Sequence, residues 1–315
     1  MSRILVIRLG ALGDFFLSFS AFAAIRARHV GDRVTLLTTA PFAALAGASP
    51  WFDAVAVDAR PAWWNLVGLW RLRRQLRGFD FVYDLQTSQR SSRYFRLAGR
   101  PAWSGIAAGA SHPHDNPLRD YMHTRERQRE QLEMAGAASF PEPDLGWLPA
   151  GRGLPVPYAL LVPGAAATRP RKRWPAAQYG ALAAVLAGRG LTPVVLGASA
   201  DAPAAAAIRA ACPTAVDLTG QTRIEDIHAI AAGAALAVGN DTGPMHIAAA
   251  SGCPCVVLFS ADSDPALTAP RGPGGNWPRL LRAPVLADLP LDRVVEALEG
   301  ALKEAWSGAL DPPKA

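Results

Sequence analysis

Short apolar runs separated by segments of helix length recur along the whole chain, and this alternation most constrains the fold. In the first half the runs cover residues 4–9, 34–38, 54–57, 79–85 and 103–106. In the second half they cover residues 158–162, 192–197, 214–218, 234–238 and 254–259. Strands joined by helical crossovers run parallel, and helices then cover both faces of the sheet. The sequence therefore predicts an α/β protein with parallel sheets.

The chain is long for a single core. Its 315 residues fit two α/β domains of about 150 residues each. Proline and glycine concentrate in residues 141–157, where the apolar periodicity fades, so we place the boundary there. The predicted domains are residues 1–150 and 151–315. Residues 291–306 are expected to form a final helix that can pack back on the first domain.

One motif carries the strongest chemical signal. Residues 239–246 read GNDTGPMH, directly after one apolar run and before another. A strand that ends this way and opens into a helix presents free backbone N–H groups, the positive end of a helix dipole and the Asp241 carboxylate together. The motif predicts a site for the phosphates and hydroxyls of a nucleotide-linked ligand. His246 falls in the first helical turn, where we expect it to donate toward phosphate.

A second glycine turn follows the first predicted strand. Residues 10–14 read GALGD, so Gly10 and Gly13 shape the turn and Asp14 closes it. Open α/β sheets place their ligands at the carboxyl ends of their strands, and a carboxylate there can act as a general base for a hydroxyl. The alternative is that Asp14 only caps the following helix. The turn lacks the complete G-x-G-x-x-G spacing of a dinucleotide site.

Residues 162–175 join another predicted strand to a helix that begins near Pro175. Small side chains in this segment let a ligand approach the backbone, while Thr168 and Lys172 can donate to phosphate oxygens. Arg169 and Arg171 are better explained as a solvated basic loop.

Metal and disulfide signals are weak. Asp262-Ser263-Asp264 mimics a D-x-D motif and His112-Pro113-His114-Asp115 could suggest ligands, but neither has a supporting partner at ligand spacing. We assign no metal. The three cysteines contain no C-x-x-C pair, which favours a reducing cytoplasm.

Positive charge is concentrated in one segment. The net charge is +6, and residues 60–100 hold nine arginines but two acidic residues, interleaved with tryptophan and tyrosine. This pattern fits either a solvated arginine face or a surface for a phospholipid or phosphorylated glycolipid. Nucleic acid is not predicted because no binding motif accompanies the charge. Neither a membrane span nor a signal peptide is expected.

Three of these segments together resemble the ADP-heptose:lipopolysaccharide heptosyltransferases of glycosyltransferase family nine. Residues 4–14 resemble that family's first strand and turn, Lys172–Pro175 its Lys-x-Trp-Pro segment, and residues 239–246 its Asp-Thr-Gly-x-x-His motif. Residues 79–86 resemble a further, less specific stretch. The resemblance implies a GT-B fold, with two Rossmann-like domains facing a central cleft and the donor held on the second. It also implies inverting transfer without a metal or other cofactor, with an ADP-sugar as co-substrate.

Carried over by position, Asp14 is the implied catalytic base. The implied donor contacts are Thr168, Lys172, Asp241, Thr242, Gly243 and His246, with Gln221, Thr222 and Glu225 near the base or ribose. The loop at residues 260–265 replaces the family's more usual Gly-Pro-Thr-like sequence, so donor and acceptor identity are not fixed by the motifs.

The resemblance implies a nucleotide-sugar donor, a phosphorylated glycolipid acceptor and an anionic inner-leaflet surface as partners, and no nucleic acid. The expected location is the cytoplasm, peripheral on the cytoplasmic face of the inner membrane. Two other functions stay open: a nucleotide-sugar hydrolase or epimerase of the same fold, and a non-catalytic nucleotide-sugar or lipid-binding protein.

Overall fold

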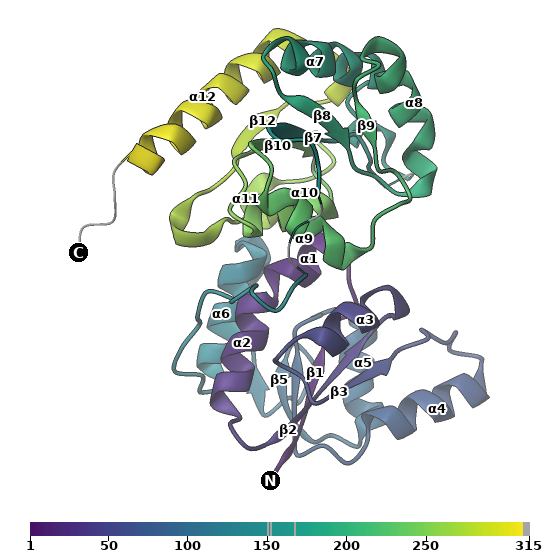
Figure 1. The fold of residues 1–315 in the computed structure, drawn as a ribbon. Helices are drawn as coiled ribbons and strands as arrows, with labels where there is room; N and C mark the ends of the chain where they lie inside the picture. Colours follow the sequence, from purple (N-terminus) through teal and green to yellow (C-terminus); the bar gives the residue numbers. More distant parts are fainter. Residues whose placement is uncertain (150, 152, 167, 311–315) are drawn as a thin grey trace. The chain divides into compact units, whose positions relative to one another are not determined.

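The computed structural model describes residues 1–149, 151, 153–166 and 168–310. Two compact units make up the chain, Met1–Trp147 and Leu148–Ala315 (Figure 1). The predicted boundary lay between residues 150 and 151, and residue 150 itself lies outside the described residues.

The first unit is built on a six-stranded parallel sheet in the order β3-β2-β1-β4-β5-β6. Its strands are β1 (Arg3–Ile7), β2 (Arg33–Thr38), β3 (Ala54–Val57), β4 (Phe81–Asp84), β5 (Ala102–Gly105) and β6 (His112–Pro113). Its helices are α1 (Leu12–Leu17), α2 (Phe19–Arg28), α3 (Ala40–Ala48), α4 (Leu66–Leu76), α5 (Gln89–Ala98) and α6 (Thr124–Met134), with a 3₁₀ turn at Arg119–Tyr121.

The second unit has its own six-stranded parallel sheet, in the order β12-β11-β10-β7-β8-β9. Its strands are β7 (Tyr158–Val162), β8 (Thr192–Val195), β9 (Val216–Asp217), β10 (Leu236–Asn240), β11 (Cys255–Phe259) and β12 (Arg279–Arg282). Its helices are α7 (Ala176–Gly188), α8 (Ala202–Ala211), α9 (Ile224–Ala232), α10 (Gly243–Ala250), α11 (Pro265–Thr268) and α12 (Leu291–Leu310). Short 3₁₀ turns cover Pro170–Lys172, Ser199–Asp201, Pro273–Gly275 and Leu286–Asp288.

The two sheets share one topology. Counted from the first strand of each unit, both have the order 3-2-1-4-5-6 of a Rossmann-like sheet. The strand order reverses between β1 and β4 in the first unit and between β7 and β10 in the second. Ligands of such sheets bind outside the carboxyl ends of the strands at this switch point, so the fold marks one such place in each unit.

The predicted strands are confirmed, because each of the ten apolar runs overlaps a strand of the structure. The sequence analysis missed β6 and β12, which form outer edges of the two sheets. β6 has two residues, and β12 reads RLLR with charged ends and alternating exposure. Neither carries the buried apolar run by which the other strands were found.

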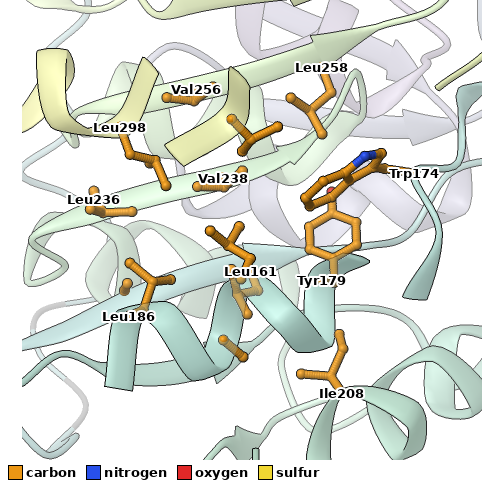
Figure 2. Packing of buried hydrophobic residues seen from close by; sticks show 14 of the residues in the cluster. Leu161, Trp174, Tyr179, Leu186, Ile208, Leu236, Val238, Val256, Leu258 and Leu298 are labelled. Atoms are coloured by element: carbon orange, nitrogen blue, oxygen red, sulfur yellow. The ribbon is translucent and has the colours of Figure 1, made fainter. Parts of the chain in front are cut away.

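The core of the second unit lies between its sheet and helices α7, α8 and α12 (Figure 2). Leu161, Val238 and Val256 point from neighbouring strands into this layer. Trp174 packs edge-on against Tyr179 at 4.8 Å between ring centres, and its indole N–H donates to the Leu289 carbonyl at 2.8 Å. This pair fixes the entrance to α7, which begins one residue after Pro175.

The last helix, α12, buries Val294, Ala297 and Leu298 in that same core. The expectation that it also packs back on the first domain stays a prediction. Within the described residues, no helix combines the length and apolar content that a bilayer span requires.

In the first unit, Phe15, Phe19 and Phe22 recur at the i, i+4, i+7 spacing of one helix face, and all three are buried. The helix is interrupted, however, with Ser18 lying between α1 and α2. The turn before α1 requires glycine at position 10, where φ is +120° and a Cβ atom would lie 2.8 Å from the Phe42 ring. The Phe42 ring, itself stacked on Phe15 at 4.9 Å, therefore closes over the backbone of this turn.

Candidate functional site

The site of the second unit is built around a buried ion pair. Lys172 follows β7 and Asp241 follows β10, the two strands between which the sheet order reverses. Lys172 Nζ lies 2.5 Å from Asp241 Oδ2, and the two side chains are 10% and 7% exposed. An ammonium group is thereby held at the carboxyl end of the sheet, beside the start of α10.

His246 completes this group from within α10. Its Nε2 lies 3.9 Å from Asp241 Oδ1, and its side chain is 6% exposed. Its Nδ1 is buried and has no hydrogen-bond partner in the part of the chain that the structure describes. Burial alone would raise the pKa of Asp241, but the interactions with His246 and Lys172 outweigh it and lower the pKa to about 2. Asp241 is therefore ionised at neutral pH.

Helix α10 starts at this point in the chain. Thr242 is its N-cap residue, in an extended conformation and without a capping hydrogen bond from its side chain. Gly243 and Pro244 follow in the first turn, where helical N–H groups have no intrahelical partner. Backbone N–H groups, a helix dipole and the Lys172 ammonium thus meet in one place, which is suited to an anion.

Asn240, at the end of β10, forms hydrogen bonds to the segment that follows β7. Its Oδ1 accepts hydrogen bonds from the Trp174 N–H at 3.2 Å and the Tyr179 hydroxyl at 3.1 Å. Its Nδ2 donates to the Pro163 carbonyl at 2.8 Å. The fully buried amide therefore fixes the loop after β7 against the end of β10.

The loop after β7 is also held from its other side. Arg173 donates to the Ala165 carbonyl at 2.6 Å and lies 3.7 Å from Asp201 Oδ1. A Cβ atom on Gly164 would lie 2.6 Å from Asp201 Oδ2, so a larger residue at position 164 would displace the Asp201 carboxylate. Asp201 thus positions the segment that carries Thr168 and Lys172.

The predicted donor residues divide into two groups. Lys172, Asp241, Thr242, Gly243 and His246 come together around β7 and β10. Thr168 is exposed on the loop after β7, and Ala167 beside it lies outside the described residues. Gln221, Thr222 and Glu225 follow β9, which is separated from β7 by β8. These three residues therefore lie at the same edge of the sheet as Lys172, but two strands away from the end of β7.

Arg171 differs sharply from its neighbour Lys172. Its side chain is 61% exposed and its Nε lies 3.4 Å from Asp262 Oδ1. This agrees with its interpretation as a solvated loop residue. Asp264 also has a structural role, since it accepts a hydrogen bond from the Ala266 N–H at the start of α11.

The site of the first unit contains Asp14, two residues past the start of α1. Asp14 does not cap this helix, because the N-cap residue is Ala11. Its side chain is 38% exposed, and its Oδ1 lies 3.5 Å from Arg8 Nη2. Arg8 is almost fully buried and donates to the Leu85 carbonyl at 2.7 Å. A solvent-accessible carboxylate is thus held beside a buried guanidinium.

A second carboxyl group lies beneath this pair. Asp84 ends β4 and is fully buried, and its Oδ1 accepts hydrogen bonds from the N–H groups of Gln86 and Thr87 at 3.1 and 3.0 Å. Burial raises the pKa of Asp84 to about 6, although hydrogen bonds and the Arg8 charge oppose this rise. Arg8 therefore lies near two carboxyl groups, one accessible and one buried.

Sequence reasoning missed Arg8, Asp84, Asn240 and Asp201 as parts of these sites. Arg8 interrupts an otherwise apolar strand, and Asp84 and Asn240 each end a buried strand, so a search for polar residues in those places would have found them. Asp201 carries no comparable signal, since its role depends on the approach of Gly164.

The structure places no metal-binding group among the described residues, where no three His, Cys, Asp or Glu side chains have a suitable arrangement. His114 Nε2 instead lies 2.7 Å from Glu130 Oε2, and His112 Nδ1 lies 3.0 Å from the Ser111 hydroxyl. The absence of a metal in the reaction stays a prediction.

Comparison with known proteins identifies the family. Residues 112–277, more than half of the chain, match the model of glycosyltransferase family 9 (heptosyltransferase). The chain belongs to this family. Among curated members, it is 33% identical over 122 residues to lipooligosaccharide heptosyltransferase 2 of Haemophilus influenzae. It is 31% identical over 154 residues to lipopolysaccharide heptosyltransferase 2 of Salmonella typhimurium.

These matches are partial. They cover 37% of this chain and 35% of the Haemophilus protein, and 43% of this chain and 44% of the Salmonella protein. The chain therefore spans less than half of the length of these curated relatives.

Solved family 9 structures show the same fold over nearly the whole chain. A glycosyl transferase family 9 protein from Veillonella parvula matches with a TM-score of 0.77 and 20% identity, over 96% of this chain and 97% of that one. E. coli heptosyltransferase WaaC with ADP matches with a TM-score of 0.76 and 22% identity, over 95% and 99% of the two chains. The predicted α/β fold of GT-B type is confirmed at the level of two Rossmann-like sheets.

Proposed function

We propose that this protein is a metal-independent, inverting glycosyltransferase that moves a heptose from an ADP-sugar to the inner core of a lipopolysaccharide acceptor. The family supports sugar transfer, and one observation in the structure carries the assignment of the donor site. This observation is the buried Lys172 ammonium, held by Asp241 at the start of α10. The relatives named above support heptose as the sugar, and E. coli WaaC was solved with ADP.

The donor diphosphate would lie at the N-terminus of α10. Lys172, His246 and the N–H groups near Gly243 would donate to its oxygens and offset the negative charge that grows as it departs. Asp241 orients Lys172 and is itself ionised, so the pair is neutral before the diphosphate arrives. Thr168, Thr222, Gln221 and Glu225 remain proposed contacts to the rest of the nucleotide.

The acceptor hydroxyl would be activated by Asp14. In the proposed step the hydroxyl proton passes to the Asp14 carboxylate while the oxygen forms a bond to the sugar C1. The bond between C1 and the diphosphate oxygen breaks, and its electron pair leaves with ADP. Attack from the face opposite the diphosphate inverts the configuration at C1. Arg8 holds the carboxylate in place from below.

The acceptor is proposed to be a phosphorylated glycolipid, so the reaction would take place at the cytoplasmic face of the inner membrane. Incubation with ADP-heptose, with and without a truncated lipid A–Kdo acceptor, tests the proposal. Transfer predicts ADP release and a heavier glycolipid only when the acceptor is present. Free heptose without acceptor would indicate a hydrolase, an altered sugar on intact donor an epimerase, and no turnover a binding protein. Each of these three results would contradict the proposal.

A further inference from the structure

Helix α4 of the first unit and the turn before it carry a cluster of apolar side chains that the fold leaves uncovered. Trp64, Leu66, Val67 and Trp70 are between 57% and 85% exposed. Within the described residues, the other large apolar side chains with comparable exposure occur singly or, at Leu118 and Tyr121, as a pair. Figure 1 shows α4 on the outside of its unit, and the helix contacts α5. A compact exposed apolar group of this kind marks an interaction surface.

The buried side of α4 fixes the direction in which its exposed side faces. Leu72 and Leu76 are fully buried and join the core that contains Tyr94, Phe95 and Trp103. At 100° per residue, Val67 and Trp70 fall on the side of the helix opposite these two leucines, and Leu66 lies at its flank. Packing of α4 on its unit therefore turns its apolar first turn outward.

Arginines follow this apolar group along the helix. Arg71, Arg73, Arg74 and Arg77 are all exposed. The guanidinium of Arg74 lies 4.8 Å from the centre of the Trp70 ring, and those of Arg90 and Arg93 lie 5.3 and 5.0 Å from Trp63. Residues 60–79 contain no acidic residue. Positive charge here is therefore not balanced by neighbouring carboxylates along the chain.

We propose that the outer face of α4, formed by Trp64, Leu66, Val67, Trp70 and the four arginines, docks on the surface of an anionic lipid bilayer. The apolar side chains and tryptophans would enter the interfacial layer, while the arginines contact lipid phosphates. Charge complementarity favours this occupant over a second copy of the chain, since pairing two such faces would oppose their arginines. The inference extends the proposed function, for which a lipid-linked acceptor requires the enzyme at the membrane.

Co-sedimentation with vesicles tests this inference without any sugar substrate. The parent protein should bind vesicles of phosphatidylethanolamine and phosphatidylglycerol, bind phosphatidylcholine vesicles weakly, and dissociate as salt is raised. Replacing Arg71, Arg73, Arg74 and Arg77 with glutamate should lower the partition coefficient on the order of 100-fold or more. The corresponding lysine variant should retain binding. The double variant Trp64→Ser, Trp70→Ser should weaken vesicle binding, and this loss should be largest at high salt.

The matched control changes the same amount of charge elsewhere. Arg189, Arg209, Arg223 and Arg293 are exposed on the second unit, and their replacement with glutamate should leave vesicle binding within a few-fold of the parent. All variants should keep the parent's affinity for ADP, which confirms folding.

Three results would overturn the inference: no binding of the parent to anionic vesicles, undiminished binding of the α4 glutamate variant, or equal loss in the control variant. A dimer in sizing experiments that Trp70→Ser dissociates would assign the face to a second copy instead. Transfer to a soluble, delipidated acceptor is measured separately, so failure of membrane docking and failure of the proposed reaction are distinguishable.

Discussion

The two switch points of this molecule have the same topology, and each holds a buried cation beside a carboxylate, but the residue that ends the central strand differs. In the second unit, β10 ends at Asn240. The hydrogen bonds of its side-chain amide to Trp174, Tyr179 and Pro163 hold the loop after β7 in place. In the first unit, β4 ends in the Asp84 carboxyl, buried near the Arg8 guanidinium and below the accessible Asp14. An amide that ties the loop to the strand end suits a rigid anion site, whereas an accessible carboxylate beside a buried guanidinium suits proton transfer. One sheet topology thus supports two different tasks.

The largest effect is expected at Asp14. Asp14→Asn keeps the size of the side chain but removes its basicity, so turnover should fall by about 10² to 10⁴, as is typical of the loss of a general base. ADP affinity should not change, because the proposed donor site lies in the other unit. Steady-state kinetics with calorimetric ADP titration checks both. Near-normal turnover would assign Asp14 a purely structural role in α1.

The buried carboxyl of Asp84 predicts a pH-dependent stability. Its pKa in the folded protein, about 6, lies above its value in the unfolded chain. The stabilising contribution of the protonated group is thus complete below the unfolded pKa and is lost as the pH rises through 6. Asp84→Asn removes this titration, so its stability relative to the parent should increase between pH 4 and pH 7, by up to about 3 kcal/mol.

Urea unfolding of parent and variant across this pH range measures that difference directly. Other titratable groups contribute equally to the stability of both proteins, so their contributions cancel in the difference. A stability difference that is independent of pH would mean that Asp84 titrates normally in the fold, and the electrostatic contrast between the two switch points would then be lost.

Lys172 and Arg171 offer a matched pair in the second unit. Lys172→Ala should weaken ADP binding by about 1.5 to 3 kcal/mol, the range for a hydrogen bond to a charged group. Arg171→Ala should change it little, because that side chain is exposed and pairs with Asp262. Since removal of Lys172 leaves Asp241 buried without its partner, Lys172→Ala with Asp241→Asn serves as a second variant. Equal effects at positions 171 and 172 would show that the phosphate site is misplaced.

The smallest effect is expected at Asp201, which acts through the loop rather than on the ligand. Asp201→Asn keeps an acceptor for the Ala198 N–H but removes the ion pair with Arg173. ADP affinity should fall by about 2- to 10-fold, the usual worth of one such interaction. Unchanged affinity would show that the loop is held without Asp201.

The sequence predicted every strand of the two sheets except β6 and β12, because each of the others overlaps an apolar run. It also predicted which segments would meet, since the ends of β7 and β10 are neighbours in a Rossmann-like order. It could not predict that Asn240 binds the loop after β7, or that the Asp201 carboxylate lies against Gly164. Those features depend on close approaches between distant segments, which no local pattern records. The role of Asp14 as a catalytic base stays a prediction, and its alternative role as the helix cap was wrong.

The central claim is that the donor nucleotide is held at the switch point of the second unit. Hydrogen exchange of the full chain with and without ADP tests this most directly. We predict slower exchange on ADP addition in the loop of residues 164–173 and in residues 241–247, and loss of that protection in Lys172→Ala. Protection confined to residues 9–15 and 84–88, with none in the second unit, would contradict the account.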